Sequence, residues 1–213
     1  MTTRRRMLPP GWYPESAAET RAAIERFLAV APPPPVRAAA AVAPHAGWEF
    51  SGRLALEAIR AFPPDRETIV VVGGHLSPSD PILAAAEDEL ETPLGCLRSD
   101  GDLLRSITAR LPLETDRSPD NTVEVQLPFI KYLFPRSRVL ALRAPPSAEA
   151  IRLGKAILEA SRELKRKVAV LGSTDLTHYG GNYGFAPAGR GERGLNWVRE
   201  VNDREFIERL LDM

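Results

Sequence analysis

Four short apolar runs, separated by stretches with helical spacing, constrain the fold more than any other feature of this chain. Each run has the length of a buried strand, and most are rich in β-branched residues. The runs are Ala38–Ala43, Thr68–Val72, Arg138–Leu142 and Lys167–Leu171. Strands that alternate with helices are typical of a mostly parallel sheet with helices on both faces. We therefore expect an α/β fold, a layered α/β/α domain with a mostly parallel central sheet.

The stretches around these runs carry apolar residues at the three- and four-residue spacing of amphipathic helices. The first predicted helix covers Pro14–Val30 and ends at the proline run Pro32–Pro35. The others cover Arg53–Phe62, Asp102–Leu111, Val123–Phe134, Ser147–Leu164 and Leu195–Leu211. A chain of 213 residues can bury one substantial core, so we expect a single domain over residues 1–213.

Charge and hydropathy exclude several classes of partner. Lys plus Arg equals Asp plus Glu at 28 each, so no overall field would hold the protein on nucleic acid or on an anionic membrane. No apolar run approaches the roughly 20 residues of a membrane-spanning helix. Arg4–Arg6 lacks the apolar segment of a signal peptide behind it, and we interpret it as a solvated tail. With one cysteine, Cys96, the chain is expected to be soluble and cytoplasmic.

The three histidines of the chain each follow a predicted strand. His45 lies in the turn Pro44–Gly47, His75 follows Gly73–Gly74, and His178 lies beyond the fourth strand. A lone histidine at such a place is more simply a buried side chain bonded to backbone. Ligands of open α/β sheets, however, bind beyond the carboxyl ends of the strands, and a metal site needs imidazoles from separate elements. We therefore predict that His45, His75 and His178 surround one metal site.

Asp175 precedes His178 by three residues. If a helix begins at this strand end, the two side chains share one face of it. Asp175 then has two chemical roles open to it, as a metal ligand or as a carboxylate that orients His178 and fixes its tautomer. Ser173, Thr174 and Asp175 are also good helix N-cap residues, so capping alone would explain an acidic residue there.

Three further side chains are candidates for the same pocket. Glu124 is expected at a helix start, where it offsets the helix dipole or completes a two-histidine-one-carboxylate set of the kind that binds non-haem iron. Ser51 and Trp48 belong to the segment after His45, and a serine near a histidine is consistent with a nucleophile and its base. No G-x-S-x-G elbow supports that interpretation. Cys96 is more simply a small packed residue than a nucleophile.

Several segments, taken together, resemble the Memo-like proteins, whose prokaryotic members are called AmmeMemoRadiSam system protein B. The segments are GWYP at 11–14, PHAGWEFSG at 44–52, VEVQLPFI at 123–130 and STDLTHYG at 173–180. The resemblance covers nearly the whole chain. It implies a fold similar to the class III extradiol dioxygenases, non-haem iron enzymes that open catechol rings. It also implies that His45, His75 and His178 are pocket histidines, with Asp175 as the acidic residue before the last.

The chain departs from the family pattern at three places. The family usually has a glutamate-histidine pair where this chain has Asp120-Asn121, and a longer, proline-containing loop before the histidine that matches His75. Family members also typically continue into a segment with a pocket cysteine, which Cys96 does not match, so we expect that segment to be missing here. Losing a thiolate lowers the preference for copper(I) and zinc, so iron is the expected metal, with copper and zinc as alternatives.

Three functions remain open from the sequence. The first is a metal-dependent redox or dioxygenase-like enzyme with His45 and His75 as ligands, His178 as third ligand or acid/base and Asp175 as its orienter. The second is a non-catalytic protein that binds a peptide, a small ligand or a metal in the same pocket. The third is zinc-type hydrolysis with Glu124 or Asp175 as general base, although no H-E-x-x-H element is present.

Overall fold

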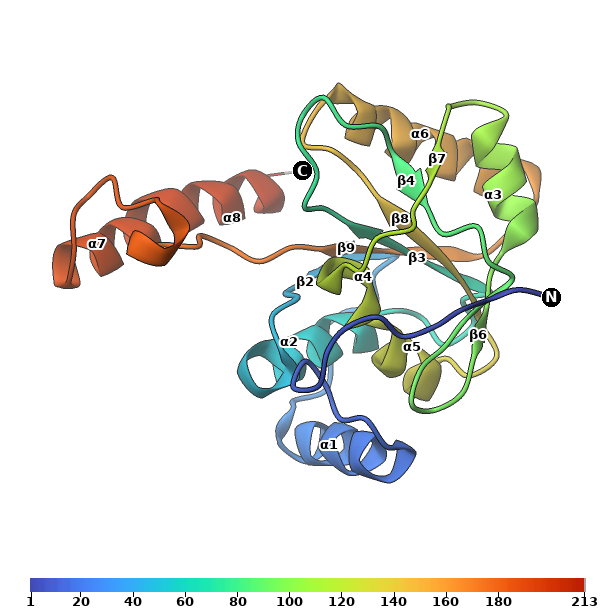
Figure 1. The fold of residues 1–213 in the computed structure, drawn as a ribbon, viewed down its shortest axis with the longest axis horizontal. Coiled ribbons are helices and arrows are strands. Elements are labelled where there is room, and N and C mark those ends of the chain that lie inside the picture. Colours follow the sequence, from blue (N-terminus) through green and yellow to red (C-terminus); the bar gives the residue numbers. More distant parts are fainter. Residues whose placement is uncertain (213) are drawn as a thin grey trace. The chain divides into compact units, whose positions relative to one another are not determined.

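The structure, a computed structural model, describes residues 1–212 of the chain. These residues divide into two compact units, a larger unit, Met1–Thr174, and a smaller unit that begins at Asp175. Figure 1 labels the helices and strands of both units. The expectation of one domain over residues 1–213 stays a prediction.

The larger unit is built around a six-stranded sheet with the strand order β2-β9-β3-β8-β4-β7. Its longer strands, which pair in parallel, are β2 (Ala40–Ala43), β9 (Val168–Ser173), β3 (Thr68–Gly73) and β8 (Arg138–Arg143). The short strand β4 (Leu83–Ala84) is antiparallel to β8, and β7 (Glu114–Thr115) is parallel to β4. The prediction of a mostly parallel sheet is confirmed, and the four predicted runs agree with these strands to within two residues at each end.

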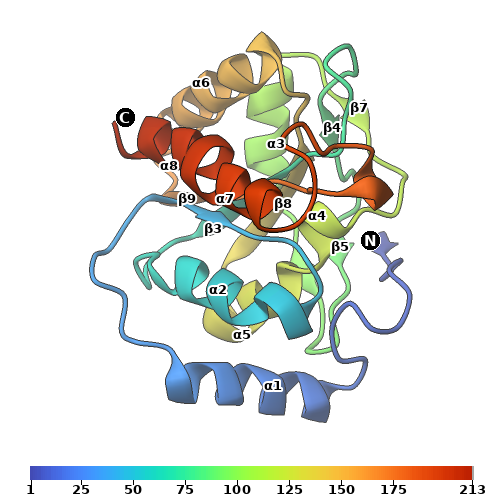
Figure 2. The same ribbon diagram turned by 90° about the vertical axis from the view of Figure 1, so that its left-hand side faces the viewer.

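The central strand β3 is covered on both faces. Ile69 and Val71 belong to one hydrophobic cluster and Val70 to the other, because successive side chains of a strand point to opposite faces. All three have no exposed surface, and burying each stabilises the fold by about 1.5–3 kcal/mol. Helices cover the two faces, as Figure 2 shows. They are α1 (Ala17–Val30), α2 (Trp48–Arg60) and α5 (Leu127–Leu133) on the first face, and α3 (Gly101–Thr108) and α6 (Ala148–Glu163) on the second.

The prediction of one helix over Val123–Phe134 is wrong, because the segment forms two. Helix α4 covers Asn121–Glu124, and Asp120 caps it by accepting a hydrogen bond from the backbone N–H of Thr122. Helix α5 has Pro128 in its first turn, where a residue without an N–H is tolerated. The short break between α4 and α5 leaves Gln126 outside both helices, and its side chain donates to the carbonyl of Pro44.

The N-terminal segment is an ordered part of the larger unit. The interpretation of Arg4–Arg6 as a solvated tail is therefore wrong for Arg4. Strand β1 (Thr3–Arg4) pairs in parallel with β5 (Glu89–Leu90), which pairs antiparallel with β6 (Leu97–Arg98). The Arg4 guanidinium donates to the backbone carbonyls of Asp116 (2.5 Å) and Ser118 (2.8 Å). A charged side chain with fixed partners is a structural residue, and charge counts alone could not identify it.

The smaller unit carries a 3₁₀ turn (Gly181–Tyr183) and then one helical segment, consisting of α7 (Glu192–Trp197), a π-helical stretch (Val198–Asn202) and α8 (Asp203–Leu211). The predicted helix Leu195–Leu211 is confirmed. Tyr179 fixes the loop that leads into it, since its hydroxyl donates to the carbonyl of Gly189 (2.7 Å) and accepts from the N–H of Ala188 (3.1 Å). Gly194 packs on the ring of Tyr179, where a Cβ would come within 2.8 Å of a ring carbon.

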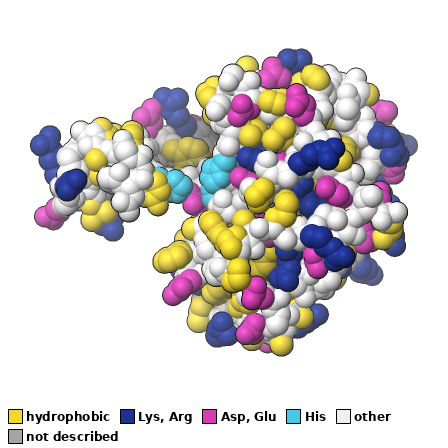
Figure 3. Space-filling model, in the orientation of Figure 1, with side chains coloured by type: hydrophobic (Ala, Val, Ile, Leu, Met, Phe, Trp, Pro, Cys, Tyr) yellow, Lys and Arg dark blue, Asp and Glu magenta, His cyan; other side chains and the backbone are white. Residues whose placement is uncertain are grey.

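The surface of the larger unit carries both signs of charge in a mixed pattern. Figure 3 shows basic and acidic side chains interspersed over the face in view, which agrees with the equal numbers of Lys plus Arg and Asp plus Glu in the sequence. Across residues 1–212, no helix combines the length and the apolar character that crossing a membrane requires.

Candidate metal site

His45 and His75 lie together at the carboxyl ends of β2 and β3. Their ring centroids are 5.0 Å apart and the rings are nearly perpendicular, at 79°. His45 is buried, with 4% of its surface exposed, whereas 46% of the His75 side chain is exposed. The sheet order places β9 between β2 and β3, so the contact is made by the loops and not by the strands. Two of the three histidines predicted for the site are thus brought together in the larger unit.

Two amide side chains hold the loop that carries His45. Asn121 donates from Nδ2 to the carbonyl of His45 (3.0 Å). Gln126 donates from Nε2 to the carbonyl of Pro44 (2.8 Å) and to Oγ of Ser173 (3.1 Å), and it is fully buried. These bonds satisfy loop carbonyls that would otherwise be buried without partners. The break between α4 and α5 therefore positions the His45 loop.

Arg143, the last residue of β8, holds the loop that carries His75. Its Nε donates to the carbonyl of Gly74 (2.9 Å) and its Nη2 to that of His75 (3.3 Å). The N–H of Gly74 donates to Oγ1 of Thr122 (3.2 Å). His75 itself has a φ of +58°, a left-handed conformation that costs free energy for a residue with a Cβ. The contacts from Arg143 and Thr122 stabilise this conformation.

Asp120 joins the imidazole of His75 to Arg143. One of its carboxylate oxygens, Oδ2, lies 3.2 Å from Nδ1 of His75 and 3.4 Å from Nη2 of Arg143. Arg143 also pairs with Asp116 at 3.4 Å, and the three charged side chains are at most 8% exposed. Such buried charges are stable only when paired and hydrogen-bonded. Asp120 thus fixes the orientation of the His75 ring.

Asp120 and Arg143 were not among the site residues predicted from the sequence. One signal was available, because Arg143 directly follows an apolar strand at the same edge of the sheet where the histidines were expected. We call residues Asp120–Gln126 the clamp segment, since its side chains contact both histidine loops. From the sequence, this segment was expected to start a helix and to contribute Glu124 as a pocket candidate, and its contacts with the two histidine loops were not predicted.

The spacing of the His45–His75 pair fits two ligands of one ion. With metal–nitrogen distances near 2.0–2.1 Å, two imidazoles on a tetrahedral ion place their ring centres about 5 Å apart. Because Nδ1 of His75 faces Asp120, Nε2 is the donor atom this ring would offer. Within residues 1–212, no group of three or more His, Cys, Asp and Glu side chains is arranged to hold an ion. The pair therefore offers at most two imidazole nitrogens to an ion.

Glu124 binds the N-terminal segment. Its carboxylate accepts hydrogen bonds from the N–H groups of Met7 (2.9 Å) and Leu8 (3.1 Å) and from the hydroxyl of Tyr13 (2.7 Å). The pKa of the Tyr13 hydroxyl is raised well above its usual range, mainly by burial and secondly by the hydrogen bond to Glu124. Three donors on one carboxylate indicate a structural role for Glu124 in holding residues 7–13 on α4.

Trp48 and Ser51 lie at the start of α2 and are both buried. Trp48 stacks on Phe129 at 3.9 Å and donates from its indole N–H to the carbonyl of Val125 (3.0 Å). Its backbone N–H donates to the carbonyl of Trp12 (2.8 Å), which brings the first two family-like segments together. Ser51 donates to the carbonyl of Ala46 (3.2 Å). These contacts indicate that both residues shape the core beside the His45 loop.

His178 and Asp175 belong to the smaller unit. Nε2 of His178 lies 3.3 Å from Oδ2 of Asp175, and the His178 ring stacks on Tyr183 at 5.0 Å. No helix begins at residues 173–178, so Asp175 does not act there as a helix cap. Asp175 contacts the imidazole, as the orienting role requires. That His178 joins His45 and His75 on one ion stays a prediction.

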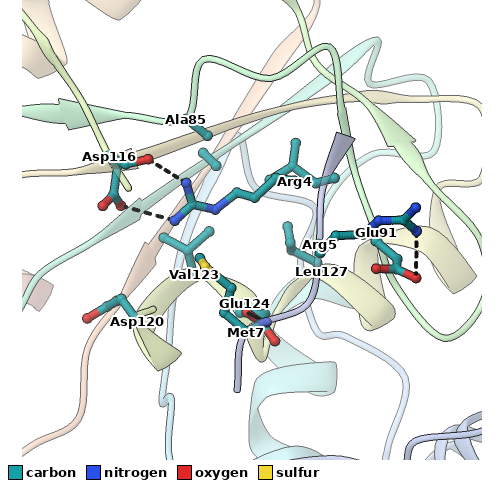
Figure 4. Close-up of a pocket in the computed structure, with 12 residues that line it drawn as sticks. Arg4, Arg5, Met7, Ala85, Glu91, Asp116, Asp120, Val123, Glu124 and Leu127 are labelled. Atoms are coloured by element: carbon teal, nitrogen blue, oxygen red, sulfur yellow. Dashed lines mark hydrogen bonds and ion pairs between the residues drawn. The ribbon is translucent and has the colours of Figure 1, made fainter. Parts of the chain in front are cut away.

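Two other features lie outside the histidine pair. Cys96 is half-buried next to β6, and burial raises the pKa of its thiol, which agrees with a packed residue. A small cavity lies under the N-terminal segment, and Arg4, Met7, Ala85 and Val123 are among the residues that line it (Figure 4). The Arg4 side chain reaches from that segment to Asp116. No pattern in the sequence indicated this cavity, because segments far apart along the chain form it.

Comparison with known proteins identifies the family. The family model described as Memo-like protein matches residues 4–213. A MEMO1 family protein of Pyrococcus furiosus is 38% identical over 190 residues, which cover 83% of this chain and 65% of that protein. Relatives in Pyrococcus abyssi and Methanosarcina barkeri, also named MEMO1 family proteins, are 35% and 32% identical over 81% of this chain and 64% and 62% of their own lengths. The chain thus spans less than two thirds of the length of these relatives. On this match of sequence, the chain belongs to the Memo-like family.

Proposed function

We propose that the protein binds a transition-metal ion through His45 and His75. The observation that carries this proposal is the 5.0 Å spacing of the two rings in the loops that follow β2 and β3. The carboxylate of Asp120 on the second nitrogen of His75 adds support, because metal-bound histidines commonly donate that N–H to a carboxylate. His178, held by Asp175 in the smaller unit, is proposed as the third donor.

Iron is proposed as the metal, with copper and zinc as alternatives, since imidazole suits all three ions. A bound iron or copper ion would supply redox chemistry, and a dioxygenase-like oxidation of a catechol is the reaction proposed from the family resemblance. Within the larger unit, the clamp segment and Arg143 fix the two loops, and Asp120 orients one ring. The alternative function is a protein that holds a metal, a peptide or a small ligand in the same pocket without turnover.

Metal binding is tested by elemental analysis of protein purified under anaerobic conditions and by titration of the apoprotein with Fe(II), Cu(I) and Zn(II). The wild-type chain is expected to bind one ion, and a His45→Ala/His75→Ala double variant to bind none with comparable affinity. His178→Ala tests the third donor and should weaken binding without abolishing it. Equal metal content in the wild-type and double-variant proteins would overturn the proposal.

Turnover is tested separately by oxygen uptake of the metal-loaded protein with a panel of catechols. Uptake above that of the double variant would support the dioxygenase-like reaction. If the protein binds metal and no catechol raises uptake above this background, the binding function is the better description of the pocket.

A further inference from the structure

We propose that an open surface cavity within the smaller unit binds a flat aromatic ligand that carries a carboxylate. The cavity is lined only by exposed or partly exposed residues between Thr177 and Val198, so it belongs to this unit alone. Its lining combines a stacked pair of rings, glycines, apolar side chains and one arginine. These features select different parts of one ligand.

The stacked pair is His178 and Tyr183, whose ring centroids lie 5.0 Å apart with planes only 14° from parallel. Each ring covers one face of the other, and the Tyr183 residue remains 61% exposed. A large aromatic side chain with an open face is a platform for a further ring, because offset stacking of rings is favourable beyond the area it buries. The pair therefore favours a flat aromatic group over a branched aliphatic one.

The rest of the lining leaves room for such a group. Leu195 and Val198 of the helical segment provide apolar contacts, and Leu195 is 47% exposed. At Gly181 an added Cβ would meet only Nη2 of Arg190, at 3.9 Å, and at Gly191 it would meet nothing within 4 Å. Backbone without side chains at these two positions allows a flat ligand to approach closely.

Arg190 supplies the charge selectivity. It lines the cavity and makes no hydrogen bond or ion pair with any other residue of the described chain, 1–212. No aspartate or glutamate is among the described residues that line the cavity. A guanidinium without an acidic neighbour matches the two oxygens of a carboxylate through paired N–H donors. The ligand that fits best thus has a carboxylate on Arg190 and a ring on Tyr183.

This inference goes beyond the proposed metal binding and does not depend on it, because no metal is needed for the contacts described. The test can therefore be run on the full chain in buffer that contains a chelator. Binding of 2-naphthoate is measured by titration calorimetry, with 2-naphthylmethylamine and cyclohexanecarboxylate as comparison ligands. The amine keeps the flat ring and reverses the charge, whereas cyclohexanecarboxylate keeps the charge and lacks the flat ring.

Two variants and a control separate the two parts of the site. Arg190→Gln should weaken binding of 2-naphthoate by about tenfold, the loss expected for one charge-assisted hydrogen bond. Tyr183→Leu should weaken it by about three- to tenfold through the loss of stacking. Arg193→Gln removes a nearby exposed arginine that does not line the cavity, and it should leave the affinity unchanged.

Three results would overturn the inference. They are no binding of 2-naphthoate to the wild-type chain at millimolar concentration, equal affinity for the amine and the acid, and equal effects of Arg190→Gln and Arg193→Gln. Circular dichroism of each variant shows whether the helical content is kept. A failure here leaves the metal titrations unaffected, and a failure to bind metal leaves this measurement unaffected.

Discussion

Nδ1 of His75 lies 3.2 Å from a carboxylate oxygen of Asp120 that is itself 3.4 Å from the guanidinium of Arg143. The carboxylate is buried, with 8% of the side chain exposed, and the imidazole is about half exposed. This arrangement holds the ring at Nδ1, so Nε2 is the nitrogen that the proposed metal site would use. The predictions for Asp120 and Arg143 depend on it.

Asp120→Ala should weaken metal binding by about 10- to 100-fold, because the His75 ring loses the group that orients it. The measurement is a competition titration with a chelator of known affinity. Asp80→Asn is the matched control, since the Asp80 carboxylate lies in the loop after His75 but accepts from the N–H of Ser77. Equal losses in the two variants would contradict an orienting role for Asp120.

Arg143→Met should lower the free energy of unfolding by about 3–5 kcal/mol, because the buried Asp120 would lose its guanidinium partner and the buried Asp116 would keep only Arg4. Urea denaturation measures the change. Arg152→Met removes an exposed pair with Glu149 and should cost no more than about 1 kcal/mol. The prediction fails if the two arginine variants are equally stable.

Stability should fall in alkaline solution partly through Tyr13. Burial and the bond to Glu124 raise the pKa of Tyr13 in the folded protein above the value of about 10 that holds in the unfolded chain. Above pH 10 the unfolded chain releases this proton more readily than the folded protein, so the contribution is complete below pH 10 and declines as the pH rises. The free energy of unfolding of the wild-type chain should therefore fall more steeply above pH 10 than that of Tyr13→Phe. Parallel curves would exclude Tyr13 as the cause.

Gly73→Ala should destabilise the fold by about 1–3 kcal/mol, the usual cost of overpacking. A Cβ at this position, the end of β3, would lie 2.0 Å from Oγ1 of Thr122 and 3.0 Å from a methyl group of Val123. At the neighbouring Gly74 an added Cβ meets nothing within 4 Å, so Gly74→Ala is the control and should change stability by less than about 0.5 kcal/mol. Thermal unfolding of the two variants compares them directly, and similar midpoints would argue against close packing of α4 on β3.

The layered fold could be predicted because its signals are local. In the run Thr68–Val72 every residue after Thr68 is apolar, which is typical of a strand buried on both faces, and the amphipathic stretches between the runs have the helical period. The placement of His45 and His75 together followed from a general property of parallel sheets, whose strands end at a common edge. Neither inference needed the contacts of individual side chains.

The clamp segment could not be predicted, because its partners are remote along the chain. Asp120 is 45 residues from His75, Asn121 is 76 residues from His45, and Glu124 is 117 residues from Met7. Local patterning suggested a helix start there, and this is also true. The short strands β4 to β7 were missed for a related reason, since two residues are too few to show a period.

Helix α4 has only four residues, too few for a helix to be stable by itself in water. Its order comes from the contacts that the clamp segment makes with both histidine loops and with the N-terminal segment. We expect these contacts to break together, so that opening of α4 releases the amides of Met7 and Gly74 to solvent in one event. On this expectation the two histidine loops and residues 7–8, far apart in the sequence, form one cooperative unit of local unfolding.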